Sequence, residues 1–386
     1  MSPVTIIFLT VFIDLIGFGI IIPLLPFYAE TFGANALTIG LLNTSFSFMQ
    51  FIFAPFWGRL SDRIGRRPVI LVGLLGSALS YLLFALADSL TLLFAARIAA
   101  GIAGANIPTA HAYMADVTTP ENRARGMGLV GAAFGLGFIF GPAIGGFLSQ
   151  WGYQAPSFFA SALSLANFAA AWFLLPESRP PADAGFARSS RFGDFRTAVT
   201  RRGLPSLLLI YFIVVTAFSS FEMNFSLYAG YRFGFDATSI GYVFAFIGLI
   251  LTVVQGAVVG PVVRVAGESR VIPAGIALIA AGLVLVPLAR AVPPLMGACG
   301  LIALGIALNN PSITSLISRL SRADEQGGIL GVSQSVASLA RIVGPAWGGY
   351  LYDAFGRSSP FFSAAGLLGV ACALSLMTLR AGSRGN

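Results

Sequence analysis

The 386-residue sequence contains no lysine, so all 23 of its basic residues are arginines. The phosphate-binding loop of Walker-type ATPases requires a lysine in the pattern Gly-x-x-x-x-Gly-Lys-Ser/Thr. The chain cannot form that loop, and its sequence shows no cluster of metal-ligating residues. We therefore expect a protein that is not an enzyme, does not use ATP and needs no cofactor.

Cysteine is also scarce. Cys299 and Cys372 are the only two cysteines, and both fall within long apolar runs. Disulfide frameworks belong to small, cysteine-dense secreted domains. The sequence therefore excludes a fold that depends on disulfide bonds.

Charge is the third scarcity: charged residues make up 10% of the chain, hydrophobic residues make up 56%, and the mean hydropathy is +0.85. A soluble domain of this composition would expose more apolar surface than water tolerates. A membrane-spanning helix needs about 20 apolar residues, and the chain has room for about a dozen. We predict spanning helices at 4–26, 36–57, 68–87, 91–113, 125–149, 156–175, 205–230, 238–263, 271–289, 293–317, 328–350 and 359–380.

Glycine and proline are abundant by contrast, with 45 and 21 residues. Small residues let membrane helices approach one another closely, and membrane helices tolerate proline. Together these observations predict an all-α integral membrane protein, with twelve transmembrane helices in two pseudo-symmetric six-helix bundles.

The arginines are distributed unevenly between the predicted loops. Successive loops lie on alternate sides of the membrane. The loops of one side hold only Arg232, Arg290 and Arg357. The loops of the other side and the chain ends hold Arg59, Arg63, Arg66, Arg67, Arg123, Arg125, Arg179, Arg188, Arg191, Arg196, Arg201, Arg202, Arg264, Arg270, Arg319, Arg322, Arg380 and Arg384. By the positive-inside rule, both termini and the central loop face the cytoplasm. The formal charge of +8 therefore reflects topology in a lipid bilayer, and we expect no nucleic-acid partner.

The chain contains an internal repeat with an offset of 203 residues. Identical residues coincide at this offset, namely Asn106 with Asn309, Pro108 with Pro311, Gly141-Pro142 with Gly344-Pro345, and Gly145-Gly146 with Gly348-Gly349. The long polar stretch between the halves predicts domains at 1–175 and 205–386, joined by a cytoplasmic linker at 176–204. Parallel repeats of this kind are typical of transporters that bind their substrate near the bilayer midplane.

A dense charged segment, Gly58-Arg-Leu-Ser-Asp-Arg-Ile-Gly-Arg-Arg-Pro68, separates two apolar runs and should form a short loop in water. Its order of Gly, Asp and Arg resembles the signature loop between the second and third helices of the major facilitator superfamily. The resemblance implies a pairing of Arg66 with Asp116, and a set of gate residues comprising Gly58, Asp62, Arg63, Gly65, Arg66 and Asp116. In the second half Gly260 and Gly267 remain, but Arg264 replaces the acid, so a symmetrical second gate is not expected.

Two intramembrane charges of the first half match further motifs. Asp14-Leu-Ile-Gly17, followed by Pro23-Leu-Leu-Pro26, resembles the first-helix signature of twelve-helix drug:proton antiporters, and Arg97-Ile-Ala-Ala-Gly101-Ile-Ala-Gly104 resembles their fourth-helix motif. Asp14 lies about ten residues into its helix, roughly 15 Å deep at 1.5 Å per residue, where removal from water favours a neutral carboxyl group. The resemblance implies that Asp14 carries the proton and that Arg97 influences it. The alternatives are a carboxylate that orders helix packing and an arginine in a permanent ion pair.

The predicted fifth helix is rich in glycine. Its segment from Gly131 to Gly146 is similar to the Gly-Pro-x-x-Gly-Gly motif of antiporters. Glycines four residues apart permit close helix contact, and a proline inside a helix removes a hydrogen bond and can bend it. We interpret these residues and their repeat partners as hinges, with pure packing as the alternative: Gly141, Pro142, Gly145, Gly146, Gly344 and Pro345.

Glu222 and Arg341 are the remaining intramembrane charges of the second half. They can pair with each other, or Glu222 can act instead of Asp14 as the main proton carrier, or as the counter-charge for a cationic substrate. We predict substrate-binding roles for these two residues and for the polar side chains expected near them: Asn224, Asn309, Gln255 and Gln334.

The resemblance covers essentially the whole chain. Within the first half, the sequence is similar to tetracycline-efflux-type members of the antiporter family. The predicted helix at 271–289 has no acid, although tetracycline exporters carry a functional aspartate there, so tetracycline itself is not the expected substrate. The implied function is a proton-coupled exporter of lipophilic, drug-like small molecules that works by alternating access. The resemblance also implies a monomer in a bacterial-type inner (plasma) membrane, with the lipid bilayer, protons and a small molecule as its partners.

Two alternatives remain at this point. A uniporter or symporter of the same fold could carry a sugar, a metabolite or a lipid. A membrane enzyme or sensor would need a catalytic constellation or a soluble signalling domain, and the sequence shows neither.

Overall fold

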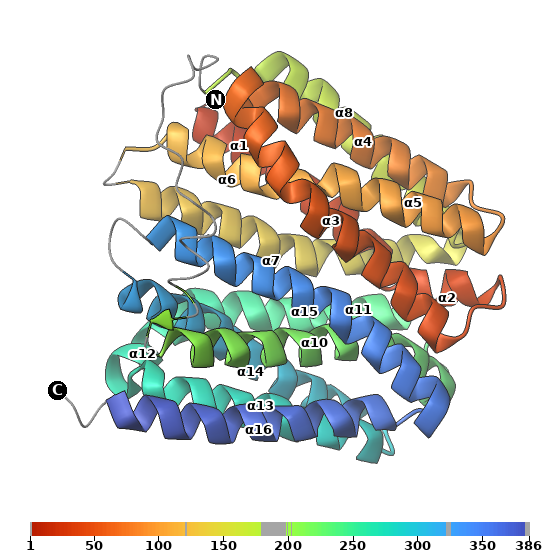
Figure 1. Cartoon of the computed structure of the whole chain (residues 1–386). Helices are drawn as coiled ribbons and strands as arrows, with labels where there is room; N and C mark the ends of the chain where they lie inside the picture. The colour runs from red at the N-terminus through yellow and green to blue at the C-terminus, as the bar shows by residue number, and fades with distance from the viewer. Residues whose placement is uncertain are drawn as a thin grey trace. The chain divides into compact units, whose positions relative to one another are not determined.

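The computed structural model of the chain describes residues 2–119, 122–178, 198, 200–201, 203–321 and 326–382. All regular secondary structure in these residues is helical (Figure 1). Most of the predicted linker, at 179–197, 199 and 202, lies outside the described residues. The predicted linker and domain boundaries therefore stay predictions.

The helices of the first half follow one another with short connections. They are α1 (Pro3–Ile21), α2 (Leu25–Glu30), α3 (Ala36–Ile64), α4 (Arg66–Ala85), α5 (Leu90–Ala103), η1 (Gly104–Asn106), α6 (Ile107–Asp116), α7 (Arg123–Leu148), η2 (Ser149–Trp151) and α8 (Gln154–Leu174).

The helices of the second half are similar in length. They are α10 (Leu204–Phe233), α11 (Ala237–Val253), the π-helical η3 (Val254–Val258), α12 (Val259–Ala266), α13 (Glu268–Leu288), α14 (Val292–Leu320), α15 (Gln326–Phe355) and α16 (Ser359–Gly382).

The predicted all-α membrane fold is confirmed. The described residues contain twelve helical spans that are long and apolar enough to cross a membrane, six in each half of the sequence. Several spans combine two helices, as in Leu90–Asp116, where η1 interrupts the helix at Gly104.

Two predicted helix ends are wrong. The second helix does not stop at residue 57 but continues to Ile64, and α4 begins at Arg66, so the charged segment is helical apart from Gly65. A helix satisfies its own backbone groups, and long arginine side chains can carry their charge outward to water. The charged segment therefore did not mark the end of the helix, and its place at a membrane face stays a prediction.

The first helix is shorter than predicted. It ends at Ile21, and the separate helix α2 follows a turn at Ile22–Leu24. Pro23 and Pro26 explain the interruption, because proline lacks the N–H that a helix interior requires.

The contacts divide the chain into two compact units. Unit 1 comprises Met1–Gly185 and Ala229–Gly248, and unit 2 comprises Phe186–Tyr228 and Leu249–Asn386. The end of α10 and most of α11 thus pack with the first half of the sequence. In unit 1, α1 packs against α7 and α8, while α4 packs against α5 and α8.

Glycines make the packing of unit 1 close. A Cβ atom at Gly141 would lie 2.6 Å from the Cα atom of Gly19, and one at Gly137 would lie 2.8 Å from Leu15 Cβ. Real Cβ atoms do not approach other atoms so closely. The backbones of α1 and α7 therefore touch, as small residues allow in membrane helices.

In unit 2, α13 packs between α14 and α16, and Figure 1 shows α13 beside α16. Glycines again line the contact of α13 with α14, because a Cβ atom at Gly305 would lie 2.9 Å from the backbone nitrogen of Ile279. Close helix contacts at glycines thus occur in both units.

Candidate functional site

Asp14 lies near the middle of α1, and its carboxyl group faces α4. One carboxylate oxygen accepts a hydrogen bond from the Ser77 hydroxyl. The other, Oδ1, is shielded from solvent and has no hydrogen-bond partner among the described residues. Within those same residues Asp14 also forms no ion pair. The structure therefore contains an acid inside a spanning helix without a compensating charge, which is costly for the ionised form.

Tyr81 lies one helical turn beyond Ser77 on α4, and the charges of both Asp14 and Arg97 act on its hydroxyl group. Its ring rests on α1 at Gly17, where a Cβ atom would come within 3.0 Å of the ring. The predicted pair Asp14 and Arg97 is thus brought around one aromatic hydroxyl. The sequence analysis did not predict Tyr81 as a site residue. The only signal for it in the sequence was Gly17, the small residue that faces its ring.

Arg97 lies on α5 and is held by α3. Its Nη2 atom donates to Asn43 Oδ1 at 3.3 Å, and its guanidinium carbon lies 4.4 Å from the centre of the Phe46 ring. Phe46 in turn stacks on Phe18 of α1, with ring centres 5.3 Å apart. A cation over an aromatic face is attracted to it, so the charge of Arg97 is stabilised without a direct ion pair to Asp14.

The gate residues that the sequence predicts gather where α3 ends and α4 begins. The guanidinium group of Arg66 contacts Asp62 at 2.7 Å and Asp116 at 3.2 Å, so the predicted pairing of Arg66 with Asp116 is present. Arg66 also donates to the Ser61 hydroxyl at 2.6 Å. We call Ser61, Asp62, Arg66 and Asp116 the first clasp. A gating role for it stays a prediction.

The geometry of the first clasp depends on Gly65. This residue has φ +99° and ψ 161°, a region that is essentially restricted to glycine. Two other predicted gate residues lie on α3 before it: Gly58, whose carbonyl accepts from Ser61, and Arg63, which is exposed. The chain can therefore leave α3 and start α4 within a single residue.

Glu177 is a residue of this region that sequence reasoning missed. Its two carboxylate oxygens accept from the backbone N–H groups of Arg66 and Arg67, at 2.8 and 3.1 Å. These N–H groups have no partner within the helix, since they belong to its first turn. Glu177 thus caps α4 from a segment more than a hundred residues away, and no local sequence pattern signals that contact.

The segment around Glu177 is fastened at further points. The Tyr113 hydroxyl donates to the carbonyl of Pro176 at 2.9 Å, and the Ser178 hydroxyl donates to Asp116 Oδ2 at 3.3 Å. The start of the predicted linker is therefore docked onto the first clasp.

Unit 2 contains a second ion pair that follows a positive-φ glycine. Gly267 has φ +75°, and the next residue, Glu268, begins α13. Its carboxylate accepts from Arg319 Nη1 at 3.0 and 3.1 Å and from the Ser315 hydroxyl at 3.2 Å. We call Glu268, Ser315 and Arg319 the second clasp. The charges of the second clasp are reversed relative to the first, and the expectation that no symmetrical second gate exists stays a prediction.

The predicted hinge residues of α7 make close backbone contacts. Gly141 and Gly145 face α1, whereas a Cβ atom at Gly146 would lie 3.0 Å from the Cα atom of Gly241 on α11. The Thr238 hydroxyl donates to the Gly146 carbonyl at 2.9 Å. Pro142 lies inside the helix between these contacts. The arrangement is a tight seam within unit 1, and its role as a hinge stays a prediction.

The repeat partners in α15 form a similar contact in unit 2. A Cβ atom at Gly344 would lie 2.6 Å from the carbonyl oxygen of Thr216 on α10, and Pro345 follows inside the helix. Asn224 is fully buried beside Gly348 and donates to the Ser220 carbonyl at 2.8 Å. Asn224 therefore sits within a helix–helix contact.

Glu222 and Arg341 lie close enough for their charges to interact, and Tyr211 acts on Arg341 as well. Arg341 is exposed although it lies in the middle of α15, and Glu222 is half-buried. The structure thus brings this predicted pair together in unit 2.

The other polar candidates divide into two kinds. Asn309 is fully buried at the contact of α14 with α13 and donates to the Gly305 carbonyl at 3.2 Å. Gln255, in the π-helical segment η3, and Gln334, on α15, are exposed. The glutamines are therefore accessible to a ligand, whereas Asn309 is engaged in packing.

Twelve apolar spans, buried charges within them and a repeated half define a class of protein, the secondary carriers of membranes. The family model of the Major Facilitator Superfamily matches residues 7–289 and 252–386. The chain belongs to this family, whose members are transporters and not enzymes.

Curated relatives are similar along most of their length. The chain is 36% identical to the class E tetracycline resistance protein of Escherichia coli over 355 residues, covering 89% of this chain and 86% of the relative. It is 32% identical to multidrug resistance protein 2 of Bacillus subtilis over 352 residues, covering 89% and 87%. The predicted resemblance to efflux proteins is confirmed at this level.

Solved structures agree with the fold. The human organic anion transporter MFSD10 matches with a TM-score of 0.74 and 28% identity, covering 96% of this chain and 98% of that one. A POT family transporter in complex with 5-aminolevulinic acid matches with a TM-score of 0.79 at 13% identity, covering 97% and 94%. The second likeness concerns the fold alone.

Proposed function

We propose that this transporter exports lipophilic, drug-like small molecules in exchange for protons. The relatives that carry drug or tetracycline resistance in their names support the class of substrate. The observation that carries the proposal is the carboxyl group of Asp14, which lies in a spanning helix with Oδ1 shielded from solvent and forms no ion pair among the described residues. A group of this kind binds a proton readily when water is excluded and releases it when its surroundings become polar.

Proton coupling requires that the site differ between the two states of the carrier. Asp14 of α1 contacts the Ser77 hydroxyl of α4 and lies near Tyr81 of α4 and Arg97 of α5, so three helices contribute to its surroundings. A ligand can shift a conformational equilibrium only through different free energies of binding to the two states. Movement of α1 against α4 or α5 would change the polarity around Asp14 and so link proton release to the change of state.

The direct test uses purified protein in liposomes with a pH gradient and ethidium as the transported lipophilic cation. Asp14→Asn should abolish uphill transport, because an amide cannot exchange a proton. Counterflow, which needs no proton gradient, should survive. The matched control is Asp88→Asn, since Asp88 is an exposed acid of the connection between α4 and α5. Normal gradient-driven uptake by Asp14→Asn would contradict the assignment.

A second candidate function is export of organic anions. The observation that favours it is Arg341, a cationic residue in the middle of the spanning helix α15 that keeps part of its surface exposed. An anionic substrate would satisfy that charge, and the structural match to an organic anion transporter agrees with this chemistry. Under the first candidate, Glu222 instead attracts cationic or zwitterionic lipophiles.

Matched ligands separate the two candidates. Affinities for a cationic, an anionic and a neutral lipophile of similar size are compared in wild type, Arg341→Gln and Glu222→Gln. Loss of anion binding in Arg341→Gln alone would support anion export, whereas loss of cation binding in Glu222→Gln alone would support the first candidate. Equal losses for all three ligands would show that the charges serve structure and not selectivity.

A further inference from the structure

A small cavity lies beside Asp14 in unit 1. It has a volume of about 20 Å³, and its apolar wall includes Ile70, Leu74 and Ala110. A cavity needs roughly 10–15 Å³ in this measure to hold one water molecule. The cavity therefore has room for a single water and for little else.

Two polar side chains contribute to the wall of this cavity, Thr10 and Asp14, which lie one turn apart on α1. The Thr10 hydroxyl donates to the Ile6 carbonyl at 2.9 Å, so its oxygen can still accept a hydrogen bond. Asp14 Oδ1 is shielded from solvent and has no partner among the described residues. A buried water requires two to four polar partners, and the cavity offers two.

We propose that this cavity binds one structural water that bridges Asp14 Oδ1 and Thr10 Oγ1. When Asp14 is ionised, the water donates one hydrogen to Oδ1 and the other to Thr10 Oγ1. When Asp14 is protonated at Oδ1, the carboxyl group donates to the water oxygen instead. The water thus provides a hydrogen-bond partner for Asp14 in both protonation states, without any movement of α1.

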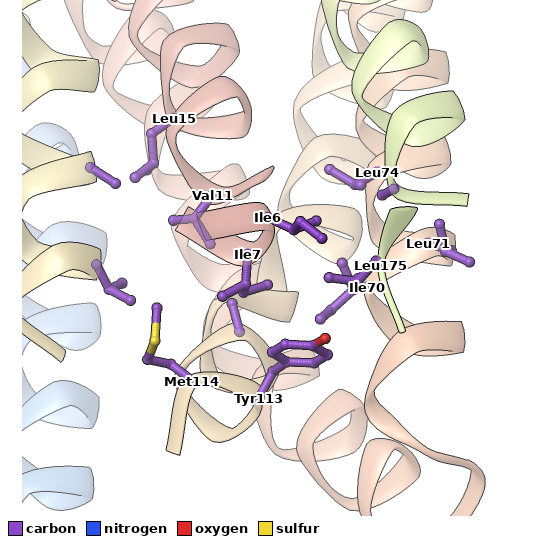
Figure 2. Close-up of a cluster of buried hydrophobic side chains, with 14 residues drawn as sticks. Ile6, Ile7, Val11, Leu15, Ile70, Leu71, Leu74, Tyr113, Met114 and Leu175 are labelled. Atoms are coloured by element: carbon purple, nitrogen blue, oxygen red, sulfur yellow. The ribbon is translucent and has the colours of Figure 1, made fainter. Parts of the chain in front are cut away.

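The side chains around the proposed water site are mostly apolar. Figure 2 shows the apolar cluster of this region, in which Ile6 of α1 lies toward Ile70 and Leu74 of α4. Tyr113 and Met114 continue the cluster toward the end of α1 where the chain begins, and both are fully buried. The significance of the water for coupling rests on the proposed function, since it matters only if Asp14 exchanges protons.

The test is infrared difference spectroscopy of the purified full-length protein. The carbonyl band of protonated Asp14 is identified as the band that Asp14→Asn lacks. Ala110→Val fills the cavity and Thr10→Val removes one partner of the water. Thr109→Val is the matched control, since Thr109 is also a buried threonine but does not contribute to the cavity wall.

In the wild type we expect a water O–H stretching band that shifts in H₂¹⁸O. Ala110→Val should lose this band, and the Asp14 carbonyl band should move to higher frequency in Ala110→Val and in Thr10→Val, because the C=O bond of a carboxyl group stiffens when its hydroxyl loses a hydrogen-bond acceptor. Thr109→Val should leave both bands unchanged. An unchanged carbonyl frequency in every variant, with no band sensitive to H₂¹⁸O, would overturn the proposal.

Two further measurements keep the result decisive. Melting temperatures show whether each variant folds, and the nearly isosteric Thr10→Val decides the outcome if Ala110→Val does not fold. Transport is measured separately on the same proteins. A wild type that shows the water band but no proton-driven export would contradict the proposed function while supporting the water site.

Discussion

The two clasps occupy corresponding places in the two units but carry opposite charges. In unit 1, Arg66 follows Gly65 and binds Asp116 at the end of α6, at 3.2 Å. In unit 2, Glu268 follows Gly267 and binds Arg319 near the end of α14, at 3.0 Å. Both glycines have positive φ, at +99° and +75°.

The comparison shows which feature of the repeated segment both units share. The backbone turn requires a glycine in both units, because other residues are strained at these angles. The ion pair requires only complementary charges, so its polarity can invert without any change of fold. A search for the same residue letters in the second half therefore misses a contact that the backbone preserves.

The clasps differ most in their burial. The Arg66 side chain is 7% exposed, whereas the Arg319 side chain is 68% exposed and only its partner Glu268, at 13%, is largely buried. Water screens an exposed ion pair, and such pairs contribute about 0–1 kcal/mol. A buried charge that loses its partner has no such compensation. We therefore expect the first clasp to matter for stability and the second to matter little.

Removing the arginine from each clasp should give the largest difference. Arg66→Gln removes a buried guanidinium group and leaves the partly exposed Asp62 and Asp116 without a cation, and should lower the free energy of unfolding by about 2 kcal/mol, a usual contribution of a hydrogen bond to a charged group. Arg319→Gln should lower it by about 1 kcal/mol or less. Unfolding in mixed detergent micelles measures both values. Equal losses would show that burial does not distinguish the clasps.

The glycines provide the next comparison. Alanine at either position should destabilise by about 1–3 kcal/mol, because of the backbone angles. At Gly65 the new Cβ atom would also lie 2.8 Å from Glu177 Cδ and displace that carboxylate, whereas at Gly267 the nearest atom, Ser269 Oγ, is 3.9 Å away. Gly65→Ala should therefore cost about 1 kcal/mol more, the usual contribution of a helix cap.

A double-mutant cycle checks this explanation. In a Glu177→Ala background the extra cost of Gly65→Ala should disappear, because the displaced carboxylate is no longer there. An extra cost that persists in this background would assign the difference to the backbone of Gly65 alone.

Glu177 and Glu268 sharpen the comparison further, since each places a carboxylate at the start of the helix after its glycine. Glu177→Gln retains one acceptor oxygen but loses the charge that favours a helix N-terminus, and should cost roughly 1 kcal/mol. Glu268→Gln should cost about 0.5 kcal/mol, since its partner is exposed. Thermal unfolding of the two variants checks the order, and a larger effect for Glu268→Gln would contradict it.

Local patterns in the sequence predicted much of this molecule. Apolar runs gave the twelve spans, and the motif around Arg66 gave its pairing with Asp116. Asp14 and Arg97 were recognised because a charge in an apolar run is conspicuous. These features depend on neighbours in the chain or on a known motif, so the sequence alone is enough to find them.

Other features depend on contacts that distant segments make only in the fold. Glu177 lies 111 residues from Arg66, and nothing in its own segment indicates that it caps α4. Tyr81 is an ordinary aromatic residue until Asp14 and Arg97 are placed around it. Asn224 and Asn309 were polar candidates for a ligand, but each lies buried against a glycine of a neighbouring helix.

The smallest expected effect tests whether the two charges of the second clasp can be exchanged without loss of stability. Glu268→Arg alone places a second cation beside Arg319 and should destabilise by about 0.5 kcal/mol, since Arg319 is 68% exposed and water screens its charge. Adding Arg319→Glu restores an ion pair with the polarity of the first clasp, so the double variant should return to within a few tenths of a kcal/mol of wild type. The same unfolding assay at low and high salt measures the change, because screening should shrink the single-variant effect. A double variant that stays as unstable as the single one would show that the N-terminus of α13 itself requires a carboxylate. In that case the inverted charges of the second clasp are fixed by the helix and not by the ion pair.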